Sequence, residues 1–257
     1  MSFNTNENDI FFGPVTSRRL GTSLGIDLLP YSDKYCSMNC VYCECGVTKT
    51  LTTISDSSKA FPTLVQIENG FRLKMKEIGN SKIESLTYAG HGEPTLHPNF
   101  LGITKLIYNL RNEFLPKSKI TLLTNSTTVN EPKIRESYKF IDKVYFKLDT
   151  VNEELFRKIN RTPQEIKLQE IVDGINSFDE KRFQVLFLQS KNFDNSLDKH
   201  IEELISTFKK LKPTEIQLYS VARFPAVEEV KPILKERMEA IHQKFVSELQ
   251  DTEILVF

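Results

Sequence analysis

The sequence predicts an α/β fold in which six parallel strands form a partial (β/α)6 barrel. Short apolar and β-branched runs recur along the chain, and longer stretches between them carry apolar residues at helical spacing. Continuous apolar runs suit strands that are buried on both faces of a parallel sheet. Right-handed crossovers curl such a sheet toward a barrel. Because closing a barrel normally takes about eight strands, six predict an open one.

The elements follow one another in a regular order. Strands are expected at 24–29, 85–89, 120–124, 144–148, 183–188 and 216–219, with a short edge strand at 253–257. The intervening apolar stripes predict helices that cover 64–71, 100–110, 168–175, 201–211 and 234–249. These stripes are interpreted as core packing. A single domain over 1–257 is expected, with an N-terminal extension (1–23), a βα core (24–225) and a C-terminal helix with the edge strand (226–257).

Composition, net charge and hydropathy narrow the class of protein to which this chain can belong. The 257 residues are 39% hydrophobic and 26% charged, which is typical of a folded protein. Lys plus Arg equals Asp plus Glu at 34 each, so the net charge does not attract nucleic acid or an anionic membrane. The first ten residues lack the basic layout of a signal peptide, and no apolar run approaches the ~18 residues of a membrane span. A cytoplasmic protein without a membrane partner is therefore expected, where four cysteines indicate metal or redox chemistry.

Three cysteines, Cys36, Cys40 and Cys43, follow the first expected strand. Three converging thiolates can hold a metal cluster and leave one metal atom without a protein ligand. On a helix the same spacing would stack three small hydrophobic residues, but Pro30 and the surrounding polar residues indicate a loop. A structural zinc site completed by Cys45 or a histidine is the other alternative, and it would make the protein a binding or interaction module.

The run Cys36-Ser-Met-Asn-Cys40-Val-Tyr-Cys43 resembles the CxxxCxxC signature of the radical S-adenosylmethionine (SAM) enzymes. The resemblance implies a partial TIM-like barrel, the radical SAM core, in which the three cysteines hold a [4Fe-4S] cluster. It further implies that SAM chelates the fourth iron and that its reductive cleavage yields a 5′-deoxyadenosyl radical for hydrogen abstraction. An external electron donor such as flavodoxin or ferredoxin is implied as well. Tyr42 resembles the aromatic residue near the cofactor's adenine.

A second motif follows the next expected strand. Gly90-His91-Gly92-Glu93 resembles the family's Gly-Gly-Glu motif, with His91 in place of the first paired glycine. The glycines would let the backbone approach a ligand closely, and Glu93 supplies an anion for a cationic amino group. Gly90, Gly92 and Glu93 are therefore expected to bind SAM. Gly-rich turns followed by proline are also common loop punctuation.

Polar residues at later strand ends complete the expected SAM site. Asn125 and Ser126 resemble the group that contacts the cofactor's ribose and carboxylate, or they form a turn that bonds its own backbone. Lys147 and Asp149 share one face by strand alternation and either meet the cofactor or pair with each other. Tyr219, on the last expected strand, is a further candidate. The catalytic residues that act on the substrate are not identified by the sequence.

The segments that resemble known families cover 12–225, and they are similar to compact radical enzymes related to wyosine base synthetase. That enzyme needs further cysteines for a second cluster, whereas only Cys45 stands outside the motif here. The resemblance thus implies ancestry more than the same activity. A nucleoside or transfer RNA substrate is favoured, with a protein or small molecule as the alternative. Basic side chains that could bind a phosphate are Arg18, Arg19, Arg157, Lys158 and Arg161, although surface charge is the commoner explanation for such residues. Cys45 is expected to be a small buried residue.

Overall fold

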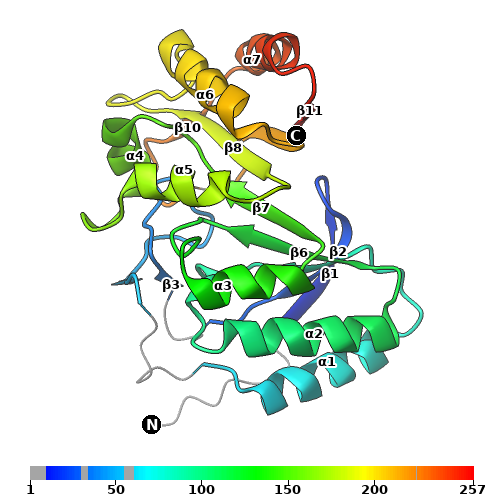
Figure 1. The fold of residues 1–257 in the computed structure, drawn as a ribbon. Coiled ribbons are helices and arrows are strands. Elements are labelled where there is room, and N and C mark those ends of the chain that lie inside the picture. Colours follow the sequence, from blue (N-terminus) through cyan, green and yellow to red (C-terminus); the bar gives the residue numbers. More distant parts are fainter. Residues whose placement is uncertain (1–9, 30–33, 55–60, 224) are drawn as a thin grey trace. The chain divides into compact units, whose positions relative to one another are not determined.

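The computed structural model describes residues 10–29, 34–54, 61–223 and 225–257, and two compact units divide them. The first unit comprises the described residues of Met1–Ser37, Thr48–Thr124 and Thr128–Val144. The second comprises Met38–Val47, Asn125–Thr127 and the described residues of Tyr145–Phe257. Pro30 and the polar residues after it, which favoured a loop, lie outside the described residues. Figure 1 shows the ribbon with its elements labelled.

The first unit contains four sheet strands in the order β1–β2–β5–β6. Its strands are β1 (Phe11–Ser17), β2 (Gly21–Ile26), β5 (Ser85–Tyr88) and β6 (Lys119–Thr124). β1 pairs with β2 antiparallel, and β5 is parallel to both β2 and β6. Short strands β3 (Tyr35–Cys36) and β4 (Thr50–Leu51) pair separately. The helices are α1 (Leu64–Ile78), α2 (Phe100–Phe114) and α3 (Pro132–Ser137), with 3-10 turns at Pro94–Leu96 and Tyr138–Phe140.

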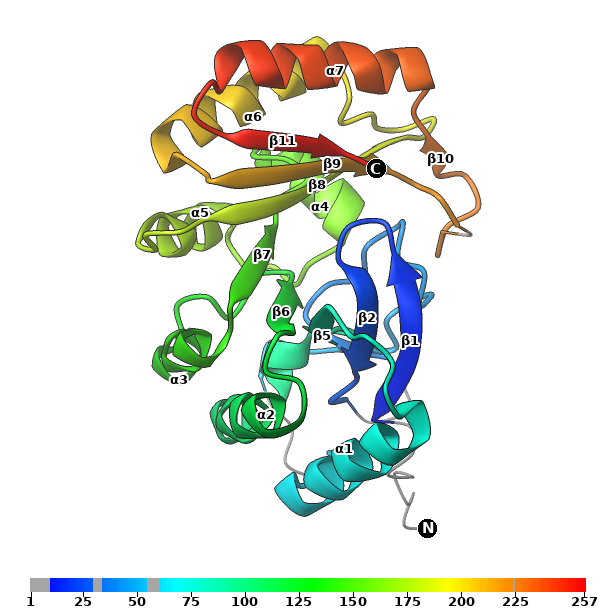
Figure 2. The ribbon, with the colours of Figure 1, turned by 90° about the vertical axis from the view of Figure 1, so that its right-hand side faces the viewer.

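The two faces of this sheet are buried in different ways. Leu24, Leu86 and Ile120 pack with Ile67 of α1 and Ile103 of α2 in one apolar core. Helices α1 and α2 lie beside the strands on that side (Figure 2). The opposite face carries buried hydroxyls that bond one another at 2.8–2.9 Å, namely Ser23, Ser85, Thr87 and Thr121. Side chains along each strand point alternately to the two faces of the sheet. The face away from the helices can hold buried hydroxyls because each of them has a hydrogen-bond partner there.

The second unit contains parallel strands in the order β7–β8–β9–β11. These are β7 (Lys143–Lys147, of which Tyr145–Lys147 belong to this unit), β8 (Arg182–Gln189), β9 (Glu215–Ser220) and β11 (Glu253–Val256), and β10 (Lys231–Pro232) pairs antiparallel with β8. The helices are α4 (Glu153–Asn160), α5 (Leu168–Asn176), α6 (Asp198–Leu211) and α7 (Lys235–Glu248). α6 and α7 cover one face of β8, β9 and β11 (Figure 2).

This sheet also has one polar face. Glu215 is 6% exposed and accepts hydrogen bonds from Tyr145 Oη (2.8 Å) and Gln217 Nε2 (2.8 Å). Gln217 Oε1 in turn accepts a bond from Gln184 Nε2 at 2.9 Å. The other face packs Phe183 and Phe187 against Phe208 and Phe245. A buried amide or carboxylate is tolerated when every polar atom is paired, as in this row.

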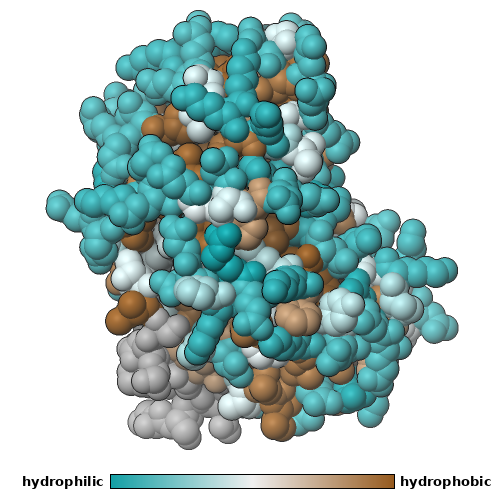
Figure 3. All heavy atoms as spheres, in the orientation of Figure 1, coloured by the Kyte–Doolittle hydropathy of each residue, from teal (hydrophilic) through white to brown (hydrophobic). Residues whose placement is uncertain are grey.

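All six predicted strands are present in the parallel arrangement that the α/β prediction requires, and the edge strand is β11. The prediction missed β1, because the turn-like Gly13-Pro14 interrupts its alternation, and it missed the two-residue strands β3, β4 and β10. The face in Figure 3 is mostly hydrophilic, with hydrophobic side chains scattered among polar ones. Among the described residues, the helices are all too short or too polar to cross a membrane.

Candidate functional site

Two of the three motif cysteines lie in a loop, as predicted, whereas the third ends a short strand that was not predicted. Cys36 ends β3 in the first unit, whereas Cys40 and Cys43 lie in the turns of Met38–Val47 in the second. All four cysteines are free thiols. Cys36 is buried, Cys40 and Cys43 are half-buried, and Cys45 is exposed, so the expectation that Cys45 is a buried residue was wrong. Cys45 falls in the polar turn that ends the loop, where the chain returns to the surface.

The end of α4 holds the cysteine loop through the backbone. Asn39 N donates to Asn160 O at 2.9 Å, and Val41 N donates to Ile159 O at 2.9 Å. The last carbonyls of a helix lack partners within the helix, so they are available to a neighbouring segment. Arg161 takes the left-handed conformation (φ 47°, ψ 52°) and ends the helix at this position. Cys40 is thereby fixed between two backbone hydrogen bonds.

A side chain from the same helix end contacts the Cys40 sulfur. Asn160 Nδ2 lies 3.3 Å from Cys40 Sγ, 3.3 Å from Asp149 Oδ2 and 3.4 Å from Tyr42 Oη. Burial is the main cause that raises the pKa of Cys40 to about 11, with the Asn160 amide lowering it and the Asp149 carboxylate raising it. Without a bound cation the Cys40 thiol is therefore protonated at neutral pH.

Asp149 is the centre of a buried polar group in the second unit. Its Oδ1 accepts bonds from Lys147 Nζ and Leu186 N, both at 2.9 Å, and its Oδ2 accepts one from Tyr42 Oη at 2.5 Å. The pairing of Lys147 with Asp149, which was one of the two alternatives for these residues, is present. Lys147 also donates to Tyr219 Oη, and its ammonium lies 4.9 Å from the Tyr42 ring centre and 4.4 Å from that of Tyr219.

The charges of this group stabilise each other. Burial by itself lowers the pKa of Lys147, but the Asp149 carboxylate and the Tyr219 hydroxyl outweigh it and raise that pKa above its usual value. Burial, followed by the Asp149 charge, raises the pKa of Tyr42 well above its usual value. Lys147 is therefore an ammonium ion and Tyr42 a neutral phenol at neutral pH. An ammonium between two aromatic rings is a favourable cation–π arrangement.

A small pocket brings several predicted residues together in the second unit. Its lining includes Met38, Asn125, Lys147, Asp149 and Asn160. Asn125 also closes a turn, because its Oδ1 accepts bonds from Thr127 N (3.1 Å) and Thr127 Oγ1 (2.9 Å). The turn that was the alternative for Asn125 and Ser126 is thus present, and Ser126 is fully buried with φ 70°. A residue at a turn can still line a pocket, and Asn125 does both.

In the first unit the Gly90–Glu93 loop bonds to the segment that carries the first cysteine. Tyr35 N donates to His91 O at 3.0 Å, and Glu93 N donates to Tyr35 O at 3.1 Å. Gly92 has φ 152°, and a Cβ on it would lie 1.7 Å from Tyr35 O. The glycine is therefore required for close approach, but the approach is to the backbone of Tyr35. The two sequence motifs meet at this point.

Asp27 and Thr124 support the same loop. Asp27 Oδ2 contacts His91 Nδ1 at 2.5 Å and accepts a bond from His91 N at 3.1 Å, and a Cβ on Gly90 would lie 2.2 Å from the Asp27 carboxyl carbon. Glu93 is 2% exposed, and its Oε1 accepts bonds from Thr95 Oγ1 (2.6 Å) and Thr124 Oγ1 (2.8 Å). These hydroxyl donors offset part of the cost of burying the Glu93 carboxyl group.

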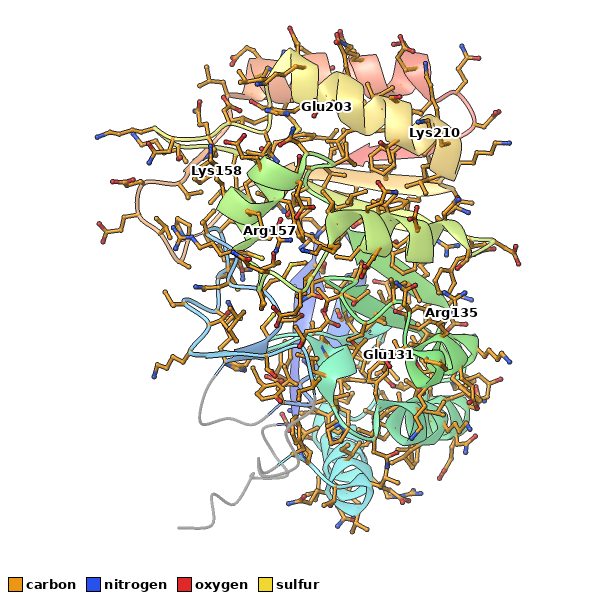
Figure 4. The ribbon with its side chains drawn as sticks, turned by 60° about the vertical axis from the view of Figure 1, so that its left-hand side comes forward. Glu131, Arg135, Arg157, Lys158, Glu203 and Lys210 are labelled. Carbon is orange, nitrogen blue, oxygen red and sulfur yellow. The ribbon has the colours of Figure 1, made fainter. Side chains whose placement is uncertain are left out.

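Sequence reasoning missed two residues of this arrangement, Asp27 and Asn160. Each carried a signal: Asp27 is a lone acid inside an apolar run, and Asn160 follows the apolar positions Leu155, Phe156 and Ile159. Conversely, Arg157, offered for a phosphate, bonds Thr162 Oγ1 (2.8 Å), Pro163 O (2.6 Å) and Ile166 O (2.5 Å). Lys158, beside it on α4 (Figure 4), pairs with Glu154 at 2.6 Å. Both basic side chains are engaged within the chain.

The thiols present suit an iron–sulfur cluster. Among the described residues, no three His, Cys, Asp or Glu side chains gather as a metal site, and the first thiol belongs to one unit while the other two belong to the second. The donor set nevertheless fits, because Cys36, Cys40 and Cys43 are soft sulfur ligands with no disulfide among them. The Asn160 N–H directed at Cys40 Sγ also fits, since a metal-bound thiolate is the stronger acceptor.

Comparison with known proteins identifies a family. The model of the Radical SAM superfamily matches residues 34–208. A UPF0026 protein of Methanocaldococcus jannaschii is 33% identical over 226 residues, which cover 87% of this chain and 67% of that protein. A GTPase Obg of Brachyspira hyodysenteriae is 30% identical over 239 residues, which cover 91% of this chain and 33% of that protein. The chain thus spans about a third of that relative's length.

Solved structures show the same fold. Streptococcus suis SuiB bound to S-adenosylmethionine matches with a TM-score of 0.62 at 14% identity, covering 90% of this chain and 50% of that chain. TYW1 with a lysine-pyruvate adduct bound matches with a TM-score of 0.62 at 13% identity, covering 89% and 75%. At these identities the likeness concerns the fold alone, and it confirms the predicted partial TIM-like barrel.

Proposed function

Because the chain belongs to the Radical SAM superfamily and to the UPF0026 proteins, we propose that it is an enzyme that holds one [4Fe-4S] cluster on Cys36, Cys40 and Cys43. When bound, the cluster would supply an electron that cleaves SAM to a 5′-deoxyadenosyl radical for hydrogen abstraction. The electron would come from an external donor such as flavodoxin or ferredoxin.

One observation carries the proposal: Gly92 packs on the backbone of Tyr35, the residue before Cys36. A glycine-rich loop could serve many purposes if it were found alone. Here the glycine lets the loop bond directly to the cysteine-bearing strand, and Glu93 follows it as a buried carboxyl group whose Oε1 accepts hydrogen bonds from two threonine hydroxyls. The proximity of the two motifs supports a common site for the cluster and the amino group of SAM.

The remaining residues would bind other parts of SAM. We propose that the cofactor contacts are made by Tyr42, Gly90, Gly92, Glu93, Asn125, Ser126, Lys147, Asp149 and Tyr219. In the second unit, Lys147 offers a held positive charge for a carboxylate, and Asp149 and Tyr219 fix its position. Tyr42 offers an aromatic face beside it. These charges and rings are ready before a ligand arrives, which lowers the cost of ordering them on binding.

We further infer a nucleoside or transfer RNA as the substrate, on the resemblance of 12–225 to wyosine-related enzymes. A protein or small molecule is the alternative outcome of the test. Since Arg157 and Lys158 bond within the chain, a phosphate would meet the exposed Arg18 at the β1–β2 turn or the exposed Arg161. Incubating the enzyme with labelled SAM and cell extract, then locating the label or mass change in RNA, protein or metabolite, separates these classes.

The cluster and the SAM cleavage are tested together. Anaerobic reconstitution with iron and sulfide should give about four irons per chain, as a cubane requires. Reductant and SAM should then yield 5′-deoxyadenosine, and Cys36→Ala, Cys40→Ala or Cys43→Ala should each abolish it. Cys45→Ser, which changes the exposed thiol, is the matched control and should retain cleavage. Stoichiometric zinc without iron in anaerobically purified protein, or no 5′-deoxyadenosine from the reconstituted chain, would refute the proposal.

A further inference from the structure

The side-chain amide of Asn160 contacts the sulfur of Cys40, although Asn160 lies outside the cysteine motif. Asn160 is the last residue of α4, 2% exposed, and its Nδ2 lies 3.3 Å from Cys40 Sγ. An amide nitrogen carries two hydrogens. One is directed to Asp149 Oδ2 and Tyr42 Oη, which leaves the other for the sulfur.

The orientation of this amide is fixed by charge. Asp149 Oδ2 lies 3.3 Å from Asn160 Nδ2, and the same carboxylate is bonded to Lys147 Nζ and Leu186 N at 2.9 Å. Turning the amide over would place its oxygen against the Asp149 carboxylate, which is unfavourable. The backbone supports the same alignment, because Asn160 O accepts a bond from Asn39 N, next to Cys40.

We infer that Asn160 is a positioning residue that donates a hydrogen bond to the Cys40 sulfur of the bound cluster and raises the cluster's reduction potential. This inference rests on the proposed function. Reduction adds one negative charge to the cluster, and part of that charge is delocalised onto the sulfur atoms of the cysteine ligands. A hydrogen bond donated to a ligand sulfur stabilises the reduced state more than the oxidised state, and hydrogen bonds to the sulfurs are a recognised determinant of cluster potentials. The motif supplies the ligands, and α4 supplies the donor.

The test compares variants at the two ends of one helix. Asn160→Leu and Asn160→Ser remove the amide donor, whereas Asn152→Ala removes the N-cap of α4, whose Oδ1 accepts a bond from Leu155 N at 3.0 Å. Asn152→Ala thus weakens the same helix without touching the sulfur. Each reconstituted protein is titrated potentiometrically without SAM, with the reduced cluster followed by electron paramagnetic resonance and iron counted per chain.

Both Asn160 variants should show a more negative potential, with about a tenfold lower equilibrium constant for reduction, or ~59 mV for a one-electron couple. Asn152→Ala should keep the wild-type potential. Equal potentials in all four proteins would overturn the inference. Failure of both Asn160 variants to hold iron, while Asn152→Ala holds it, would also overturn it, because Asn160 would then build the loop and not tune the cluster. A wild-type protein that binds no iron refutes the proposed function instead.

Discussion

In the first unit the Gly90–Glu93 loop packs its glycine backbone directly on Tyr35 and Asp27, whereas in the second unit the cysteine loop lies against charged and amide side chains around Asp149. The first arrangement depends on the absence of a side chain at Gly92. The second depends on a balance of buried charge. The two groups of residues should therefore fail in different ways, the first on added side-chain volume and the second on loss of charge.

The largest effect is expected from Gly92→Ala. The new Cβ would lie 1.7 Å from Tyr35 O, in a backbone conformation (φ 152°) that side chains rarely adopt. We expect a loss of about 4 kcal/mol or more in the free energy of unfolding, since backbone must move to make room. Urea denaturation measures it. Gly79→Ala is the matched control, because Gly79 also has positive φ (55°) but has nothing within 4 Å of the added Cβ, and the backbone strain alone should cost about 1–3 kcal/mol. Similar losses in both variants would contradict the close-approach argument.

Asp149→Asn should have the next largest effect, in the second unit. It leaves the Lys147 ammonium buried without its carboxylate, and removing one partner of a buried pair costs about 3–5 kcal/mol. Chemical denaturation of the single variants and of Lys147→Met/Asp149→Asn completes a double-mutant cycle. The double variant should recover part of the loss, because the unpaired charge is gone. If Lys147→Met worsens Asp149→Asn by its full single-variant cost, the charge-balance interpretation is wrong.

A smaller loss of stability, which originates in the first unit, is expected when the pH is lowered. Burial lowers the pKa of His97 to about 4, partly opposed by its bond to Pro62 O, so the folded protein holds this ring neutral. Its Nδ1 accepts a bond from Asn99 N at 3.0 Å, which only the neutral ring can do. Between the unfolded value near 6.5 and the folded value near 4, the unfolded state binds more protons, so stability falls as pH falls.

At pH 5 this linkage should cost about 2 kcal/mol relative to pH 7. The measurement is the free energy of unfolding at both pH values for the wild type and for His97→Gln, whose side chain does not titrate. The wild type should lose about 2 kcal/mol more than the variant between the two pH values. Parallel pH profiles for the two proteins would show that His97 is not the titrating group.

The sequence was sufficient to predict the core strands and the motifs, but it was insufficient to predict the tertiary contacts around them. The six core strands could be predicted because their apolar runs are strong, and the Lys147–Asp149 pairing because strand alternation places both residues on one face. The hydroxyls of Ser23, Thr87 and Thr121 gave no such signal. Polar residues in a strand usually indicate a solvated face, and only the tertiary fold closes this face and pairs them.

The contacts of Asp27 and Asn160 were beyond prediction for a different reason. Each residue meets its partner across a long sequence separation, Asp27 with His91 and Asn160 with Cys40. Local propensity contains no information about such pairs. The glycines were expected to allow a close approach of the backbone to a ligand. A close approach is present, but Gly92 approaches the backbone of Tyr35 and Gly90 approaches the side chain of Asp27.

The end of α4 makes the cysteine loop dependent on a segment that holds no ligand. Arg157 bonds to Pro163 O and Ile166 O, and Arg161 ends the helix so that Ile159 O and Asn160 O meet the loop. The 162–166 segment thus supports the end of α4, and the end of α4 in turn supports the cysteine loop. A variant with an intact cysteine motif but an altered 162–166 segment would be scored as competent by motif inspection and still be defective. The cysteine loop therefore depends on contacts of Arg157 and Asn160, two residues that lie outside the cysteine motif.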